Sequence, residues 1–158
     1  MKKTILITGG TGFLGYNLIK SLNLKHYDVT SLSYRRKSNK DYIKGVKYIF
    51  CNIGNFKELK KKIKKKYNFV VNFSGNIDHR KKSETFKVHY SGLKNLIKVI
   101  DKKHLKLFIQ IGSSLEYGKL KSPQKERIIC KPISYYGKAK YLSSKYVLKK
   151  LNKFLILR

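Results

Sequence analysis

A glycine-rich turn between an apolar run and an amphipathic stretch constrains the fold more than any other feature of this chain. The apolar run covers residues 4–7, and the turn, TGGTGFLG, covers residues 8–15. This order predicts a strand, a tight turn and a helix that ends near residue 24. Three glycines of the turn lack a Cβ atom, so the backbone can turn sharply and let a pyrophosphate lie against N–H groups at the helix start. Those glycines are Gly9, Gly12 and Gly15.

Strand-like and helix-like patterns alternate along the rest of the chain. This alternation predicts an α/β fold with a doubly wound parallel sheet, in a single domain over residues 1–158. A chain of this length has room for one core and for no second domain of ordinary size. The further predicted strands cover residues 27–33, 46–50, 68–73, 107–111 and 151–158. The further predicted helices cover residues 56–66, 83–103 and a segment around Tyr136.

The chain is strongly basic, with 38 Lys+Arg against 8 Asp+Glu and a formal net charge of +30. Such a charge ordinarily indicates a nucleic-acid or anionic-membrane partner. The lysines, however, are scattered along the whole chain, and the densest run, residues 57–66, carries apolar residues at helical spacing. This run is therefore interpreted as the solvated face of a helix, opened by an Asn55-x-x-Glu58 capping box, and no specific nucleic-acid partner is expected.

Cysteine spacing and the first residues favour a cytoplasmic protein. Cys51 and Cys130 stand alone, so neither a disulfide framework nor a metal site is expected. The apolar run that follows Met1 ends at Ile7, which is too short for a leader peptide or a membrane span, and no membrane partner is expected.

Residues 8–15 resemble the cofactor loop of the short-chain dehydrogenase/reductase superfamily, and their Gly-Phe-Leu-Gly ending is similar to its extended branch, the NAD-dependent epimerase/dehydratase family. The resemblance implies a Rossmann fold with strand order 3-2-1-4-5-6 and a pyrophosphate site that includes Phe13 and Leu14. It covers nearly all of this chain but about the first half of a family member. The C-terminal substrate domain is therefore expected to be absent.

Two strand ends extend the resemblance to the rest of a dinucleotide. Asn52-Ile53 is similar to the family's Asp-Ile or Asp-Leu pair, which faces the adenine ring, although Asn52 replaces the usual acid. Phe73-Ser74-Gly75 resembles the family's small-residue turn beneath the ribose and nicotinamide. The resemblance implies that all five residues contact the cofactor.

The end of the second predicted strand bears on the choice between NAD and NADP. Relatives specific for NAD carry an acid there for the ribose 2′-hydroxyl, whereas this chain has Ser33 followed by Arg35 and Arg36. Two guanidiniums beside the ribose favour a 2′-phosphate, so NADP is the predicted cofactor and NAD the alternative. The alternative interpretation, that Arg35 and Arg36 are ordinary surface cations of a basic chain, stays open.

A Tyr136-x-x-x-Lys140 pair places a phenol and an ammonium one helical turn apart. A nearby ammonium favours phenolate, so the pattern predicts a lowered phenol pKa suited to proton transfer. In the family the tyrosine moves the proton, the lysine also holds the cofactor ribose, and a serine or threonine fixes the substrate oxygen. By the family's spacing that serine is Ser113.

The resemblance implies an enzyme acting on a nucleotide-linked sugar. Sugar-nucleotide 4,6-dehydratases of the family carry an Asp-Glu pair directly after the catalytic Thr. This chain has Ser114-Leu115 there, and Glu116 lies one place too late. Epimerisation or 4-keto reduction is therefore expected rather than dehydration. A dinucleotide-binding module without turnover is the alternative.

The resemblance also implies a homodimer, formed through the helices at residues 83–103 and 135–150. His89 stands where the family usually has Asn, and it is interpreted as a packing residue.

Overall fold

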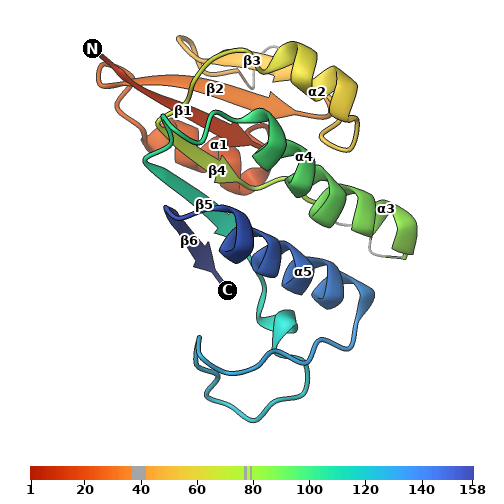
Figure 1. Cartoon of the computed structure of the whole chain (residues 1–158). Helices are drawn as coiled ribbons and strands as arrows, with labels where there is room; N and C mark the ends of the chain where they lie inside the picture. The colour runs from red at the N-terminus through yellow and green to blue at the C-terminus, as the bar shows by residue number, and fades with distance from the viewer. Residues whose placement is uncertain (37–41, 77, 79) are drawn as a thin grey trace.

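A computed structural model of the chain describes residues 1–36, 42–76, 78 and 80–158. In this part of the chain, six strands form one sheet in the order β3-β2-β1-β4-β5-β6, and every neighbouring pair is parallel (Figure 1). The predicted doubly wound Rossmann sheet is therefore confirmed. The strands are β1 (Lys3–Thr8), β2 (Tyr27–Ser33), β3 (Lys47–Phe50), β4 (Phe69–Asn72), β5 (Leu107–Ile111) and β6 (Phe154–Leu157).

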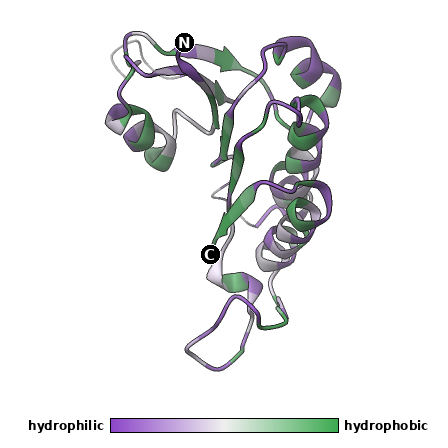
Figure 2. Cartoon of the chain, turned by 60° about the vertical axis from the view of Figure 1, so that its left-hand side comes forward, coloured by the Kyte–Doolittle hydropathy of each residue, from purple (hydrophilic) through white to green (hydrophobic). Residues whose placement is uncertain are grey.

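Helices lie on both faces of the sheet. Figure 2 shows α1 (Phe13–Ser21) on one side of the sheet and the other helices stacked on the opposite side. This second layer contains α2 (Phe56–Lys62), α3 (Lys82–Phe86), the π-helical turn η2 (Lys87–Ser91), α4 (Gly92–Val99) and α5 (Tyr135–Lys150). A short 3₁₀ turn, η3 (Ser114–Glu116), follows β5.

Alternating side chains of the strands fill a core on each face. In β1, Leu6 points into the larger core, which is closed by α2, α4 and α5, while Ile5 and Ile7 point into the smaller core under α1. β6 follows the same rule at the edge of the sheet. Its Phe154 and Ile156 pack on the larger core, so Leu155 and Leu157 face the other way and are 44% and 47% exposed.

The prediction of one regular helix over residues 83–103 is wrong, because the observed helix contains a π-helical turn and ends earlier. The structure has α3, η2 and α4 in continuous succession, ending at Val99. Within the π-helical turn, the backbone N–H of Gly92 reaches the carbonyl of Lys87, five residues back. The Ser143 hydroxyl of α5 lies 2.8 Å from the carbonyl oxygen of His89. The same hydroxyl lies 2.8 Å from the Ala139 carbonyl oxygen of its own helix, so a carbonyl of the turn and one of α5 share this donor.

The helix after β3 starts as predicted but ends early. The Asn55 side chain accepts a hydrogen bond from the backbone N–H of Glu58 at 3.2 Å, so the predicted N-cap is present. The Glu58 carboxylate accepts from the N–H of Asn52 and from Lys62, so only half of the predicted capping box is observed. The helix ends at Lys62 rather than near residue 66, because Ile63 is extended and its side chain enters the core.

Candidate functional site

The predicted site residues lie at the end of the sheet where the carboxyl ends of three adjacent strands meet, and this end is called the carboxyl edge. Thr8 of β1 is in register with Asn72 of β4, and Asn72 is in register with Gln110 of β5. Because the strands are parallel, the segments that follow them leave the same edge. Those segments are the glycine turn, residues 73–75 and residues 112–116.

The glycine turn is held by backbone hydrogen bonds and needs residues without a Cβ. Gly9 has a φ of 71°, and its N–H donates to the Leu32 carbonyl at 2.7 Å. A Cβ on Gly9 would lie 2.9 Å from the Phe73 carbonyl oxygen. A Cβ on Gly15 would overlap the Gly9 carbonyl oxygen, which also accepts from Gly12. The turn is therefore packed too closely for side chains at these positions.

The start of α1 has the donors that an anion needs. Gly12 is the N-cap residue and offers no side-chain acceptor to the first turn, so the N–H groups there lack a capping partner of that kind. The side chains of Phe13 and Leu14 are exposed, leaving the helix start accessible. A pyrophosphate fits this donor set, because its oxygens can take the place of a cap.

The residues that were predicted to select between NAD and NADP, here called the ribose selector, are Ser33, which is anchored, and the exposed Arg35 and Arg36. The Ser33 hydroxyl accepts a hydrogen bond from the backbone N–H of Thr11 at 3.1 Å, so Ser33 holds the glycine turn. Arg35 and Arg36 are exposed, and the Arg36 guanidinium lies 5.3 Å from the centre of the Phe50 ring. These cations lie at the end of β2, beside the glycine turn.

The predicted adenine pair is turned partly inward. The side-chain oxygen of Asn52 accepts from the N–H of Gly54 at 2.9 Å, which leaves its amide N–H groups as donors for a base. Ile53 is 6% exposed and packs in the larger core. The Asn95 side chain donates to the Ile53 carbonyl at 3.1 Å and fixes this corner to α4.

The end of β4 lies between the glycine turn and His89. The N–H of Ser74 donates to the Thr8 hydroxyl at 3.3 Å and to the Asn72 side-chain oxygen at 3.2 Å. Phe73 packs on the α1 side of the sheet, and a Cβ on Gly75 would lie 2.9 Å from the His89 ring. The structure thus brings the glycine turn and residues 73–75 together.

Tyr136 lies at the start of α5, between His89 and Ser113. The His89 ring meets the Tyr136 ring edge-on, with centroids 5.1 Å apart, and the phenol hydroxyl is hydrogen-bonded to Ser113. Burial raises the pKa of Tyr136; the bond to Ser113 lowers it, and the charge of Glu116 raises it further. The predicted lowering of this pKa is wrong, because burial outweighs the stabilising hydrogen bond.

The Lys140 ammonium is buried beneath the tyrosine. Its side chain is 5% exposed, and its Nζ atom donates to the Ile111 carbonyl at 2.8 Å. Nζ lies 5.7 Å from the centre of the Tyr136 ring. Burial lowers the pKa of Lys140 to about 8, against the opposing effect of Glu116. The three residues predicted as Ser-Tyr-Lys are therefore close together.

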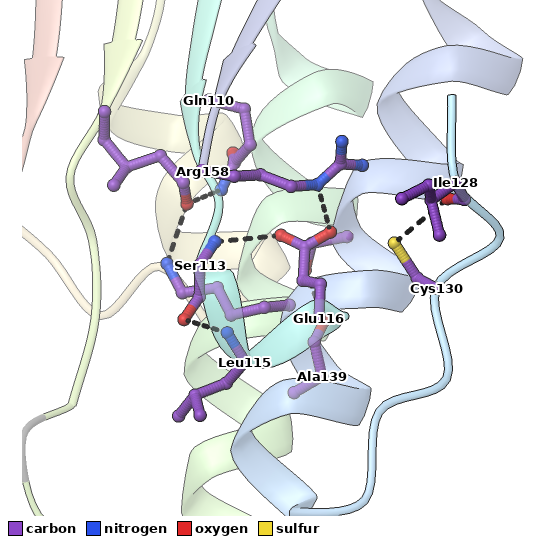
Figure 3. A network of polar contacts seen from close by, with 11 residues as sticks. Gln110, Ser113, Leu115, Glu116, Ile128, Cys130, Ala139 and Arg158 are labelled. Carbon is purple, nitrogen blue, oxygen red and sulfur yellow. Dashed lines mark hydrogen bonds and ion pairs between the residues drawn. The ribbon is translucent and has the colours of Figure 1, made fainter. Parts of the chain in front are cut away.

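Glu116 organises the turn that carries Ser113, a role that sequence reasoning missed (Figure 3). Its fully buried carboxylate accepts from the Ser113 N–H at 3.0 Å and from Arg158 Nε at 2.9 Å. The Ser113 hydroxyl in turn accepts from the N–H of Leu115 at 3.2 Å. The Ser-x-x-Glu spacing is that of a capping box and was the available signal.

The described ranges contain neither a metal-binding cluster nor a membrane-spanning helix. Within them, no group of three or more His, Cys, Asp or Glu side chains could hold a metal ion. Among the described helices, none is both long enough and apolar enough to cross a membrane.

Comparison with solved structures identifies the same fold in two enzymes, one crystallised with NAD and the other with UDP-glucose. The chain aligns over its whole length with the Bordetella bronchiseptica enzyme WbmG in complex with NAD, covering 53% of that chain at 21% identity and a TM-score of 0.88. It aligns over 98% of its length with a UDP-glucose 4-epimerase of Thermotoga maritima in complex with UDP-glucose, covering 54% of that chain at 22% identity and a TM-score of 0.85. The chain thus spans about half the length of these proteins.

Sequence comparison gives the family. A curated UDP-glucose 4-epimerase from Vibrio cholerae is 51% identical over 41 residues, which are 26% of this chain and 12% of that protein. The model of the NAD dependent epimerase/dehydratase family matches residues 5–154. This match covers nearly the whole chain, including the glycine turn, both strand ends and the Tyr136 helix. The chain therefore belongs to the NAD-dependent epimerase/dehydratase family.

Proposed function

We propose that this chain is the dinucleotide-binding half, a single Rossmann domain over residues 1–158, of a cytoplasmic NAD(P)-dependent enzyme that epimerises or 4-keto-reduces a nucleotide-linked sugar. The observation that carries the proposal is the Tyr136 hydroxyl, bonded to Ser113 and one helical turn from the Lys140 ammonium, at the same sheet edge as the glycine turn. Family membership supports the reaction class.

The dinucleotide pyrophosphate binds at the start of α1. There the N–H groups of the first turn meet the anion, and the glycine turn allows close approach. Asn52 and Ile53 would hold the adenine end of the cofactor, and Phe73, Ser74 and Gly75 would hold its ribose and nicotinamide end. NADP is the proposed cofactor and NAD the alternative. Relatives with this fold have been crystallised with either one.

A bound nicotinamide supplies hydride acceptance and return, and the chain supplies the proton chemistry. Tyr136 Oη takes a proton from the sugar hydroxyl or returns one to the carbonyl, since it has a bonded serine and a nearby cation. Ser113 Oγ donates to the sugar oxygen and fixes its distance from the phenol. Lys140 stabilises the phenolate and binds the cofactor ribose.

Cofactor binding gives the first test of the proposal. Calorimetric titration with NADP+ and NAD+ at one fixed salt concentration is expected to show binding of both and tighter binding of NADP+. Replacing Arg35 and Arg36 together by Ala is expected to weaken NADP+ alone by about 10-fold, the loss of one to two exposed phosphate contacts. The matched control, Lys60→Ala with Lys61→Ala, removes the same charge from α2. Equal losses in the two double variants would refute the selector role.

Turnover gives the second test, on the longest polypeptide encoded in frame with this chain. Tyr136→Phe is expected to abolish interconversion or reduction of nucleotide sugars and to leave dinucleotide affinity within about 2-fold. Tyr135→Phe, one residue earlier and exposed, is the matched control and is expected to stay active. Dinucleotide binding without turnover of any nucleotide sugar would instead support the inactive module. Light scattering on the same samples tests the proposed homodimer, which forms through residues 83–103 and 135–150.

A further inference from the structure

A row of buried polar groups crosses the strand ends between the glycine turn and Lys140. The Thr8 hydroxyl donates to Asn72 Oδ1 at 2.5 Å, and Asn72 Nδ2 donates to Gln110 Oε1 at 2.8 Å. Gln110 Nε2 then donates to the Ile111 carbonyl at 2.8 Å, and the same carbonyl accepts from Lys140 Nζ. The side chains of Thr8, Asn72 and Gln110 are buried.

Each amide of this row has one orientation available to it. If the Gln110 amide were flipped, its oxygen would face the Ile111 carbonyl oxygen and its nitrogen would face Asn72 Nδ2. Two acceptors and two donors would then meet in a buried place, and each would be left without its hydrogen bond. Asn72 is fixed in the same way, because its oxygen accepts from Thr8 and from the N–H of Ser74.

The Gln110 side chain donates a hydrogen bond to the same backbone carbonyl that accepts from Lys140. The Ile111 carbonyl is the backbone group on which the ammonium rests, and Gln110 supplies its second donor. Figure 3 shows Gln110 beside the turn that carries Ser113 and Glu116. The titratable groups around Lys140 are Glu116 of η3, Tyr136 of α5, His89 of η2 beyond the phenol ring, and Arg158 and Cys130 beyond Glu116.

We infer that Gln110 is a positioning residue, which holds the Ile111 carbonyl under the Lys140 ammonium and ties it through Asn72 to Thr8, where the glycine turn begins. The two ends of the proposed dinucleotide site are thereby parts of one buried hydrogen-bonded unit. The inference rests on the proposed function in one respect: it takes Lys140 as the cation that serves the cofactor.

Titration of Lys140 tests the inference without any cofactor. Trace labelling with acetic anhydride across about pH 6 to 11, read lysine by lysine by mass spectrometry, gives a midpoint for Lys140. The wild-type midpoint is expected near the lowered pKa of about 8. Gln110→Met lets the ammonium leave its buried position and regain water, so the midpoint is expected to rise by about one pH unit or more.

Two further variants keep this test decisive. Thr8→Val, a near-isosteric change at the far end of the row, is expected to raise the midpoint by a smaller amount, and it decides the question if Gln110→Met does not fold. Phe108→Leu is the matched control, since it alters a buried residue on the same face of β5 and leaves the row intact. Its midpoint is expected to equal that of wild type. An unchanged midpoint in the folded Gln110 or Thr8 variant, or an equal rise in Phe108→Leu, would overturn the inference.

Dinucleotide affinity separates this inference from the proposed function. Gln110→Met is expected to weaken NADP+ binding by about 3- to 10-fold in the wild-type chain and to have no further effect in a Lys140→Met chain. A general loosening of the fold would weaken binding equally in both, which would overturn the positioning role. Absence of any dinucleotide binding to the wild type would refute the proposed function, while the Lys140 midpoint would still decide the inference.

Discussion

Burial of the Lys140 ammonium should give the wild-type chain a pH dependence of stability that the Lys140→Met variant lacks. The pKa of Lys140 is lowered from 10.5 to about 8, chiefly by burial. Between these values the unfolded chain binds more protons at this position than the folded chain does. The cost of burying the lysine is therefore full below pH 8 and disappears above pH 10.5, so stability from this group rises with pH.

The size of the effect follows from the two pKa values. Between about pH 7.5 and 9.5, linkage gives a relative gain of about 2 kcal/mol for wild type over Lys140→Met, because methionine has no proton to release. The variant keeps a comparable chain length in the buried site. It also leaves the Ile111 carbonyl with its second donor, Gln110, so no buried acceptor is orphaned.

Urea unfolding followed by circular dichroism measures this difference at the two pH values. The remaining lysines titrate in both chains and cancel in the comparison. Lys138→Met is the matched control, since it removes one charge from an exposed lysine two residues earlier on the same helix. A Lys140→Met difference that stays constant from about pH 7.5 to 9.5, or one that grows equally in Lys138→Met, would refute the reasoning.

Three further substitutions test the local packing. Gly15→Ala should lower the free energy of unfolding by about 2 kcal/mol, measured by urea, because its methyl group overlaps the Gly9 carbonyl oxygen; helix propensity alone predicts a gain, so an unchanged or higher value would contradict the geometry. Asn55→Ala should cost about 1 kcal/mol through loss of the N-cap, and Asn55→Ser should restore most of it in the same assay. Glu116→Gln should lower the free energy of unfolding by about 3 kcal/mol, because it leaves the Arg158 guanidinium without its ion pair. Adding Arg158→Met should recover part of this loss in thermal melts. A Glu116→Gln chain as stable as wild type would show that the pair is not needed.

The sheet was predictable from the sequence, whereas several helix details were not. Strand order follows from the alternation of patterns and from the family resemblance carried by the glycine turn. The irregular turn around His89 was not predictable, because the donor that reaches its carbonyl comes from Ser143 on a different helix. The end of α2 at Lys62 likewise depends on the fit of Ile63 into the core rather than on local propensity.

The residues of the candidate site were predictable, but their electrostatics were not. The Tyr-x-x-x-Lys spacing predicted Tyr136 and Lys140 as neighbours, and the family resemblance added Ser113; the structure brings the three together. The direction of the Tyr136 pKa was wrong because spacing gives the nearby ammonium but not the burial of the phenol or the charge of Glu116. Both of these depend on how α5 packs on the turn after β5.

The role of Gln110 could not be predicted from the sequence of its own strand. Its strand, LFIQI, contains a glutamine that alternation allows to be either buried or exposed. Its importance depends on its register partner, Asn72, which belongs to a strand far away in the sequence. Asn52 is a similar case, because the amide that resembles a base-binding residue also closes its own turn onto Gly54.

The position of β1 in the middle of the sheet has a consequence for synthesis of the chain. β1 is the first strand to be made, and it pairs with β2 on one edge and with β4 on the other. A ribosome that adds about 5–20 residues per second needs a few seconds to pass from the end of β2 to β4. During that time β1 of the nascent chain keeps a free apolar edge, even once β3 has paired with β2, and another nascent chain can pair with that edge. The length of the β2–β4 segment therefore sets how long each new molecule is open to mispairing.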